Sequence, residues 1–166
     1  MAETATTDQT GDQIASAIED VLRSLLNFIG VRAKLDVKNT ELGYYANIKT
    51  RYSNGLLIGY RGFTLRSIQY LTRLIVQRKH PEVPGLMVDV SGYRMRRQNF
   101  LCKKATAIAR IVLETNREMA LDQLSDRERE VVEKALSPFT DVKVYAVGSG
   151  YRKNIIVAPV KLLGHN

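Results

Sequence analysis

Two glycines three residues apart, Gly59 and Gly62, are the residues of this chain best suited to contact a phosphate. They follow an apolar triplet and precede an amphipathic helical pattern, which is typical of a tight turn at a helix N-terminus. Glycine has no Cβ, so its backbone can approach a ligand closely, and the N–H groups of a helix start attract anions. Arg61 adds a positive charge between the two glycines. The turn is predicted to grip a nucleic-acid backbone, the alternative being a purely structural glycine turn.

The second feature that suggests a polyanionic ligand is the charge. The 166 residues carry a formal charge of +8, with 45% hydrophobic and 25% charged residues, a composition typical of a globular protein. Between Tyr93 and Lys104 the bases have no acid among them. This run favours a polyanion-binding surface over an ordinary solvated helix face. Its bases are Arg94, Arg96, Arg97, Lys103 and Lys104.

Several classes of function lack the residues that they need. Cys102 is the only cysteine and is expected to be a small core residue rather than a nucleophile, and it cannot form an internal disulfide. His80 and His165 are the only histidines, so no zinc site of the usual ligand set is expected. Gly148–Gly150 lies between two predicted strands and is interpreted as a hairpin turn, not a dinucleotide fingerprint. The sequence thus predicts a non-catalytic protein without a cofactor, metal or membrane-spanning segment, located in the cytoplasm.

The order of hydrophobic patterns predicts an α+β fold in two parts. Residues 11–91 read as helix, strand, strand, glycine turn with a short helix, helix and strand, with the helices on one face of a three-stranded sheet. Residues 92–160 begin with a long helix, to about Arg117, that is expected to join the two parts rigidly. A second helix and about three short strands follow. Residues 1–10 are expected to be a disordered leader and residues 161–166 a tail.

Individual side chains can also be assigned. The hairpin pattern places Leu42 on the buried face, and Ser125 with Glu128 has the spacing of a capping box at a helix start. The helix predicted over residues 63–78 has its inward stripe at five apolar positions, Leu65, Ile68, Leu71, Ile75 and Val76.

Four segments together closely resemble the Jag (SpoIIIJ-associated) proteins of bacteria. They read LLIGYRGFTLRSIQYLTRLIVQR, GYRMRRQNFLCKKA, MALDQLSDRERE and YRKNIIVAP, and the resemblance covers about residues 11–160. It implies a type II KH domain (α-β-β-α-α-β) over 11–91. It further implies, over 92–160, a domain named for an Arg-x-x-x-His motif that binds single-stranded nucleic acid. Longer family members carry a further N-terminal domain.

The resemblance also implies roles for particular residues. In KH domains the Gly-x-x-Gly loop clamps the backbone of about four unpaired nucleotides. In this sequence that loop is Gly59, Tyr60, Arg61 and Gly62, where Tyr60 either stacks on a base or caps the loop. The bases would lie over an aliphatic groove, for which the sequence offers Leu57, Ile58, Leu65 and Val88.

The second part departs from the family motif. Aligning the helix puts the motif arginine at Arg129 and Glu133 at the histidine position. These residues are four apart and are expected to pair, and a carboxylate repels a phosphate that a histidine would bind. The site is therefore predicted to be weakened or remodelled, the alternative being an ordinary surface ion pair. Further bases expected at this surface are Arg127, Arg152 and Lys153.

Two functions follow from these observations. The first is a single-stranded RNA-binding protein of the bacterial cytoplasm, with single-stranded DNA as another possible ligand; the resemblance implies that it regulates cell elongation or division. The second is a protein–protein adaptor for which RNA is secondary. The resemblance implies a second small KH-domain protein, or the membrane-protein insertase, as its partner.

Overall fold

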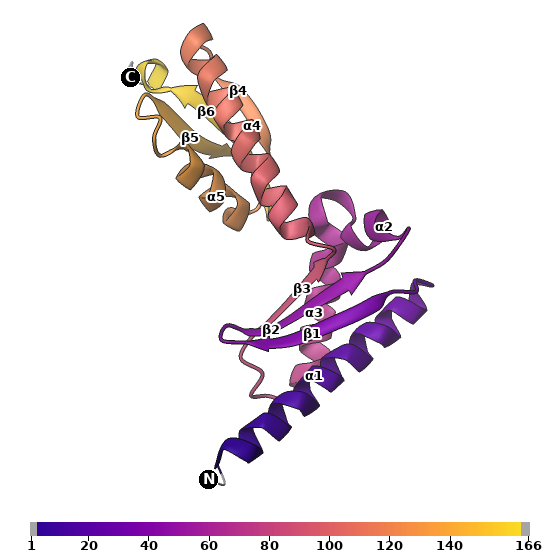
Figure 1. Cartoon of the computed structure of the whole chain (residues 1–166). Coiled ribbons are helices and arrows are strands. Elements are labelled where there is room, and N and C mark those ends of the chain that lie inside the picture. Colours follow the sequence, from indigo (N-terminus) through magenta and orange to yellow (C-terminus); the bar gives the residue numbers. More distant parts are fainter. Residues whose placement is uncertain (1–2, 164–166) are drawn as a thin grey trace. The chain divides into compact units, whose positions relative to one another are not determined.

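The computed structural model describes residues 3–163 (Figure 1). The chain divides into two compact units, Met1–Arg94 and Met95–Asn166, which we call the first and second unit. Each contains helices and a three-stranded sheet, as expected for an α+β protein. His165 and the end of the predicted tail lie outside the described residues. No helix in the described part of the chain is long and apolar enough to cross a bilayer.

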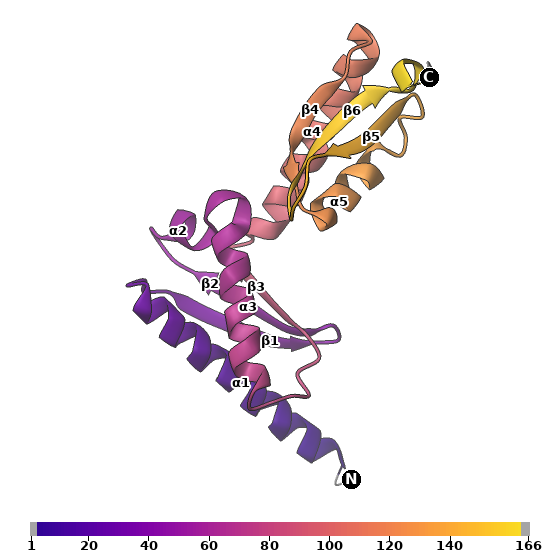
Figure 2. The same ribbon diagram turned by 180° about the vertical axis from the view of Figure 1, so that it is seen from behind.

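The first unit contains the element order that the sequence predicts. Its β1 and β2 pair antiparallel and β3 pairs parallel to β2, giving the sheet order β1-β2-β3. α3 lies behind this sheet in Figure 1 and in front of it in Figure 2. The elements are α1 (Glu3–Phe28), β1 (Lys34–Thr40), β2 (Gly43–Lys49), α2 (Asn54–Ile58), a 3-10 turn (Tyr60–Gly62), α3 (Phe63–Gln77) and β3 (Leu86–Val90).

The first helix begins before the predicted boundary. α1 starts at Glu3, inside the segment expected to be a disordered leader. This segment contains no proline, and extending an existing helix adds one hydrogen bond for each residue that is fixed. The helix nucleated by the apolar stripe from Ile14 onward therefore continues toward the N-terminus.

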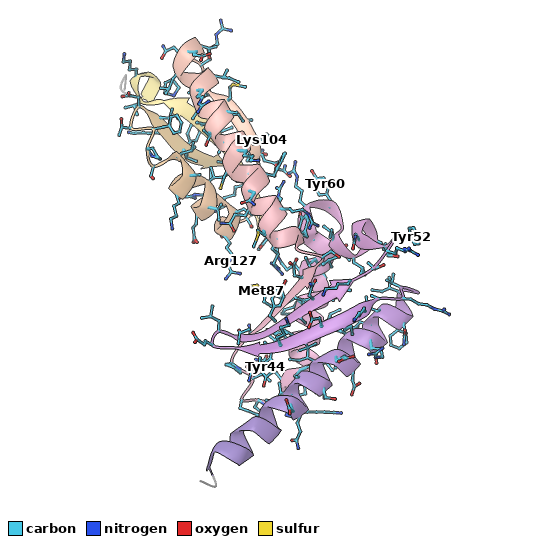
Figure 3. All side chains as sticks on the ribbon, in the orientation of Figure 1. Tyr44, Tyr52, Tyr60, Met87, Lys104 and Arg127 are labelled. Atoms are coloured by element: carbon cyan, nitrogen blue, oxygen red, sulfur yellow. The ribbon has the colours of Figure 1, made fainter. Side chains whose placement is uncertain are left out.

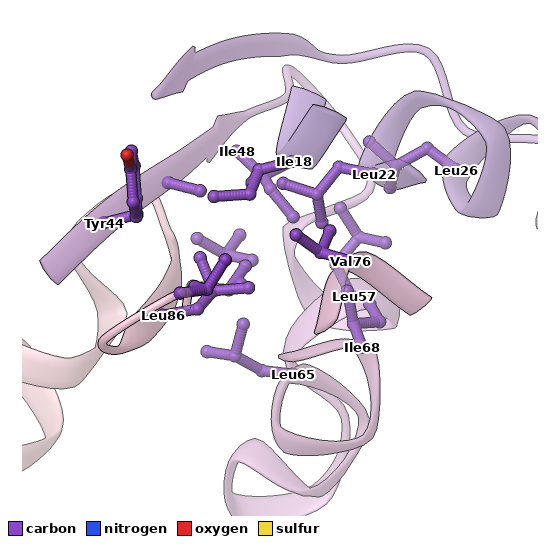
Figure 4. Packing of buried hydrophobic residues seen from close by; sticks show 14 of the residues in the cluster. Ile18, Leu22, Leu26, Tyr44, Ile48, Leu57, Leu65, Ile68, Val76 and Leu86 are labelled. Carbon is purple, nitrogen blue, oxygen red and sulfur yellow. The ribbon is translucent and has the colours of Figure 1, made fainter. Parts of the chain in front are cut away.

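One apolar core holds the first unit together. Tyr44, Ala46 and Ile48 alternate along β2 and face the helices, as the period of a half-buried strand requires. Ile18 and Leu22 of α1 are fully buried against them, and α3 adds its own stripe to the same cluster (Figure 4). Because α1 and α3 share this cluster, both cover one face of the sheet.

Three predicted inward positions are wrong. Leu71 and Ile75 are 45% and 42% exposed, and the buried stripe of α3 runs instead through Thr72. Thr72 can be buried because its hydroxyl donates to the Ile68 carbonyl at 2.7 Å. Leu42 is 94% exposed because Thr40 pairs with Gly43, which leaves Leu42 in the hairpin turn.

The second unit packs its helices on an antiparallel sheet of order β4-β6-β5. The predicted capping box is confirmed, since Glu128 accepts from the Ser125 N–H at 3.0 Å and holds the start of α5. Gly148–Gly150 connects two strands, and Cys102 is half-buried. The elements are α4 (Tyr93–Thr115, which begins in the first unit), β4 (Met119–Leu124), α5 (Asp126–Leu136), β5 (Val142–Val147), β6 (Lys153–Pro159) and a 3-10 turn (Val160–Leu163).

Candidate nucleic-acid interface

The backbone of Gly59–Gly62, which we call the glycine loop, requires glycine at both ends. Gly59 has φ +67° and ψ −174°, and Gly62 has φ +79°. A Cβ on Gly59 would lie 2.9 Å from the backbone nitrogen of Thr64, and a Cβ on Gly62 would lie 2.9 Å from Cε1 of Tyr93. Both side-chain positions are thus closed by neighbouring atoms as well as by the dihedral angles.

The loop presents the N-terminus of α3. Gly62 is its N-cap residue and has no side chain, so no side chain caps the first turn. The first turn also contains no acidic residue that would neutralise the positive end of the helix dipole. The amide groups of this turn are therefore available to an anion, as in other phosphate-binding helix starts.

The two residues between the glycines form a cation–π pair. The Arg61 guanidinium carbon lies 4.7 Å from the centroid of the Tyr60 ring, within the range of a favourable contact. Arg61 has φ +50°, which is uncommon for a residue with a side chain. Tyr60 is 70% exposed, and next to the loop Phe63 is 60% exposed. An aromatic surface and a positive charge therefore lie together at the start of α3.

The residues offered for the aliphatic groove are mostly core residues. Leu57 and Val88 are 0% exposed and Leu65 is 1% exposed, so none of them has surface that a base can contact. Ile58 is partly buried and packs on the same core. The sequence pattern missed this because a groove floor and a core are both apolar.

The predicted basic run along α4 separates into two classes. Arg94 donates from Nε to the Val88 carbonyl at 2.9 Å and from Nη2 to Gln69 Oε1 at 2.8 Å, which fixes the end of β3. Arg97 is held by two carboxylates. Both arginines therefore have structural partners. Of the other three bases, Arg96 and Lys103 are exposed and Lys104 is half-buried.

The carboxylates around Arg97 belong to a buried ionic cluster, which we define as Arg97, Asp122, Glu128 and Arg152. Arg97 contacts Asp122 at 3.1 Å and Glu128 at 3.0 Å, and Arg152 contacts Glu128 at 3.3 Å. Burial alone would raise the pKa of Glu128, but hydrogen bonds from Ser125 and Arg97, together with the charge of Arg152, lower it below the usual value. The cluster therefore stays charged and joins α4, β4, α5 and the start of β6.

The two residues of α5 at the Arg-x-x-x-His positions form the ion pair that their spacing predicts. Arg129 Nε lies 2.7 Å from Glu133 Oε1, and both side chains are more than one third exposed. Arg152, expected at a nucleic-acid surface, belongs to the buried ionic cluster instead. Arg127 is exposed and Lys153 is half-buried; Arg127 and Lys104 are labelled in Figure 3.

A second charge signal was missed in the sequence. From Leu42 to Pro81 there is no acidic residue at all, and this stretch contains the glycine loop and α3. It is longer than the run on α4. The bases along it are Lys49, Arg51, Arg61, Arg66, Arg73, Arg78 and Lys79.

No metal centre accompanies these features: no three His, Cys, Asp or Glu side chains in the described part of the chain gather closely enough to hold an ion. His80 lies in the loop after α3, with Nδ1 3.4 Å from Glu82 Oε1.

Comparison with known proteins gives a consistent set of relatives. No protein-family model matches the chain. It is 30% identical over 105 residues to the RNA-binding protein KhpB of Bacillus subtilis, covering 62% of this chain and 50% of that protein. It is 28% identical over 157 residues to KhpB of Lactiplantibacillus plantarum (95% and 48%) and 27% identical over 140 residues to KhpB of Clostridium symbiosum (84% and 63%). The chain spans about half the length of the first two relatives, and all three are named as RNA-binding proteins rather than enzymes.

Proposed function

We propose that this chain is a non-catalytic, single-stranded RNA-binding protein of the bacterial cytoplasm, whose glycine loop grips the RNA backbone. The observation that carries the proposal is the uncapped start of α3, which is preceded by two glycines at positive φ and by Arg61 between them. Amide donors, a helix dipole and a guanidinium at one point suit a phosphate.

Two further observations support a type II KH reading of the first unit. The order helix, strand, strand, short helix, helix, strand agrees with α-β-β-α-α-β, and a single core lies between one face of the sheet and the helices. KhpB of Lactiplantibacillus plantarum, whose match spans 95% of this chain and so includes this region, is named for RNA binding. On this reading the loop holds about four unpaired nucleotides.

The second unit is proposed to make a smaller contribution. Arg129 is paired with Glu133, and Arg97 and Arg152 are taken up by the buried ionic cluster. Of the bases predicted at this surface, Arg96, Arg127, Lys103, Lys104 and Lys153 are proposed to meet phosphate. Each contact with a single strand adds about −0.7 to the slope of log affinity against log salt. Binding is therefore expected to weaken steeply with salt and to show limited sequence preference.

The test is fluorescence anisotropy with a labelled mixed-sequence single-stranded RNA. The Tyr60→Asp, Arg61→Asp double variant places two carboxylates at the loop and is expected to weaken binding at least about tenfold, since it removes one cation and adds repulsion. The matched control is Tyr70→Asp, Arg73→Asp, which makes the same change of residue types and charge on exposed positions of α3. Circular dichroism confirms that both variants fold.

The outcomes separate the candidate surfaces. A loss confined to the loop variant supports the proposal. An equal loss in both variants reports net charge alone and contradicts a specific role for the loop. Unchanged binding would move the site to α4 or the second unit, and absence of wild-type binding at low salt would refute RNA binding itself.

A second candidate function, a protein–protein adaptor, is favoured by one observation. Outside the buried stripe, α3 exposes Leu71, Leu74 and Ile75 by 42–45% and Tyr70 by 61%. Contiguous apolar side chains of this kind are often covered by a partner protein. The resemblance to the Jag proteins implies that the protein partner is a second small KH-domain protein or the membrane insertase. It also implies a link to cell elongation and division. Light scattering after size exclusion tests it, because a specific complex at micromolar concentration should be lost in Leu74→Glu.

A further inference from the structure

A second aromatic–arginine pair lies where β2 ends and α2 begins. Tyr52 is 88% exposed, and the Arg51 guanidinium carbon lies 6.0 Å from the centroid of its ring. Tyr60 and Arg61 form a similar pair in the glycine loop, which follows α2. Tyr52 and Tyr60 are labelled in Figure 3. α2 is thus flanked on both sides by an exposed tyrosine with an adjacent arginine.

The segment between the two pairs is unusually apolar for a surface. Four large side chains that are at least 57% exposed occur within residues 52–63, namely Tyr52, Leu56, Tyr60 and Phe63. Of the residues in α2 only Leu57 is buried. Core packing therefore accounts for Leu57 and, in part, for Ile58, and it does not involve the exposed rings on either side of the helix.

The charge around this segment restricts the ligand. The stretch without acids, 42–81, contains both pairs, and the nearest base before Arg51, Lys49, is 3.4 Å from Asp36. A ligand that offers flat aromatic rings joined by negative charges complements exposed tyrosines beside arginines. Single-stranded RNA has this chemistry along its whole length.

We propose that Tyr52 and Arg51 form a second stacking position for the single strand held at the glycine loop, with Tyr52 against a base and Arg51 near its phosphate. This inference rests on the proposed function. α2 has five residues and is about 7 Å long, more than the 3.4 Å between stacked bases, so different bases occupy the two positions. The second position therefore contributes only when the RNA extends beyond the nucleotides at the loop.

The experiment compares labelled RNAs of about four and about twelve nucleotides, the shorter being the length that a KH loop holds. Tyr52→Ala is expected to weaken binding of the longer RNA by about 5- to 100-fold, the usual effect of one lost stacking contact, and to leave the shorter one unchanged. Tyr52→Phe keeps the ring and should bind both RNAs like the wild type. Arg51→Gln should reduce the salt slope by about 0.7 for the longer RNA only.

The matched control is Phe28→Ala, which removes an aromatic ring that is 89% exposed on α1. If Tyr52→Ala binds the longer RNA like wild type, while the loop variant of Tyr60 and Arg61 does not, the inference is wrong and the proposed function stands. In that case the exposed ring is free to serve a protein partner. An equal loss of both RNAs in Tyr52→Ala would mean that Tyr52 acts through the shape of the loop, which also overturns a separate stacking position. If the wild type binds neither RNA, both proposals fail.

Discussion

The glycine loop and the buried ionic cluster both contain arginines from sequence stretches rich in bases, yet the two regions use them in opposite ways. Arg61 at the loop lies over an exposed ring, in a stretch without acids. Arg97 and Arg152 each contact a carboxylate, and their side chains are only 14% and 12% exposed. A basic run in a sequence is therefore weak evidence for a binding surface where the fold brings acids to it, as it does for Arg97.

The two regions differ in how far along the chain the partners of their arginines lie. Arg97 meets carboxylates that lie 25 and 31 positions away, on β4 and α5, so no local window of sequence contains them. The acid-free stretch, in contrast, includes β2, α2 and α3 themselves. At the glycine loop, elements that are adjacent in the chain are also adjacent in space. The local sequence composition therefore describes part of the charge around the loop.

The largest expected effect that tests this comparison is on stability. Arg97→Ala should lower the free energy of unfolding by about 3 kcal/mol, because it leaves Asp122 and Glu128 partly buried beside a single remaining arginine. Urea denaturation measures it. Lys103→Ala, an exposed base on the same helix, is the control and should change stability by less than about 0.5 kcal/mol.

If Arg97→Ala unfolded like the wild type but lost RNA affinity, the structural role assigned to Arg97 would be wrong. Arg97 would then act as a binding residue, and its two carboxylates would be incidental contacts. A destabilised variant that still binds RNA at low temperature would instead strengthen the distinction between structural and binding arginines.

A smaller effect is expected from the backbone of the glycine loop. Gly62→Ala should cost about 2 kcal/mol of stability and weaken RNA binding, because the new Cβ would meet the Tyr93 ring at 2.9 Å in addition to the strain at positive φ. Gly30→Ala is the matched control, since Gly30 has φ +75° but nothing within 4 Å of its Cβ position. It should lose only about 1 kcal/mol and keep full affinity. Equal losses in the two variants would show that the contact with Tyr93 is unimportant.

Several features of the fold could be predicted from the sequence alone. The order of elements, the capping box at Ser125 and the pairing of Arg129 with Glu133 follow from local rules of period and spacing, and the structure confirms all three. The inward face of α3 was predicted in part, with Leu65, Ile68 and Val76 buried as expected. Thr72 was missed because it is polar by type, and only the observed bond to the Ile68 carbonyl makes its burial favourable.

The candidate site was harder to predict than the fold. The glycine loop was found because glycine at positive φ has a strong local signature. Which of its apolar neighbours are exposed was harder to predict, since Leu57 is buried and Leu56, one position earlier on the same helix, is 57% exposed. A five-residue helix is too short for periodicity to set the phase, and tertiary packing decides it.

The smallest expected effect concerns the second unit. Glu133→Gln removes the carboxylate that holds Arg129, and because the pair is more than one third exposed, stability should change by less than about 1 kcal/mol. If the surface meets RNA, affinity should rise about two- to fivefold and the salt slope should steepen by up to about 0.7, the value for one added phosphate contact. Fluorescence anisotropy at several salt concentrations measures the affinity and the salt slope. Glu130→Gln makes the same charge change at an exposed position of α5 and is the control. An equal rise in both variants would reflect net charge alone, and no rise in either would make the pair of Arg129 and Glu133 an ordinary surface contact outside the RNA-binding surface.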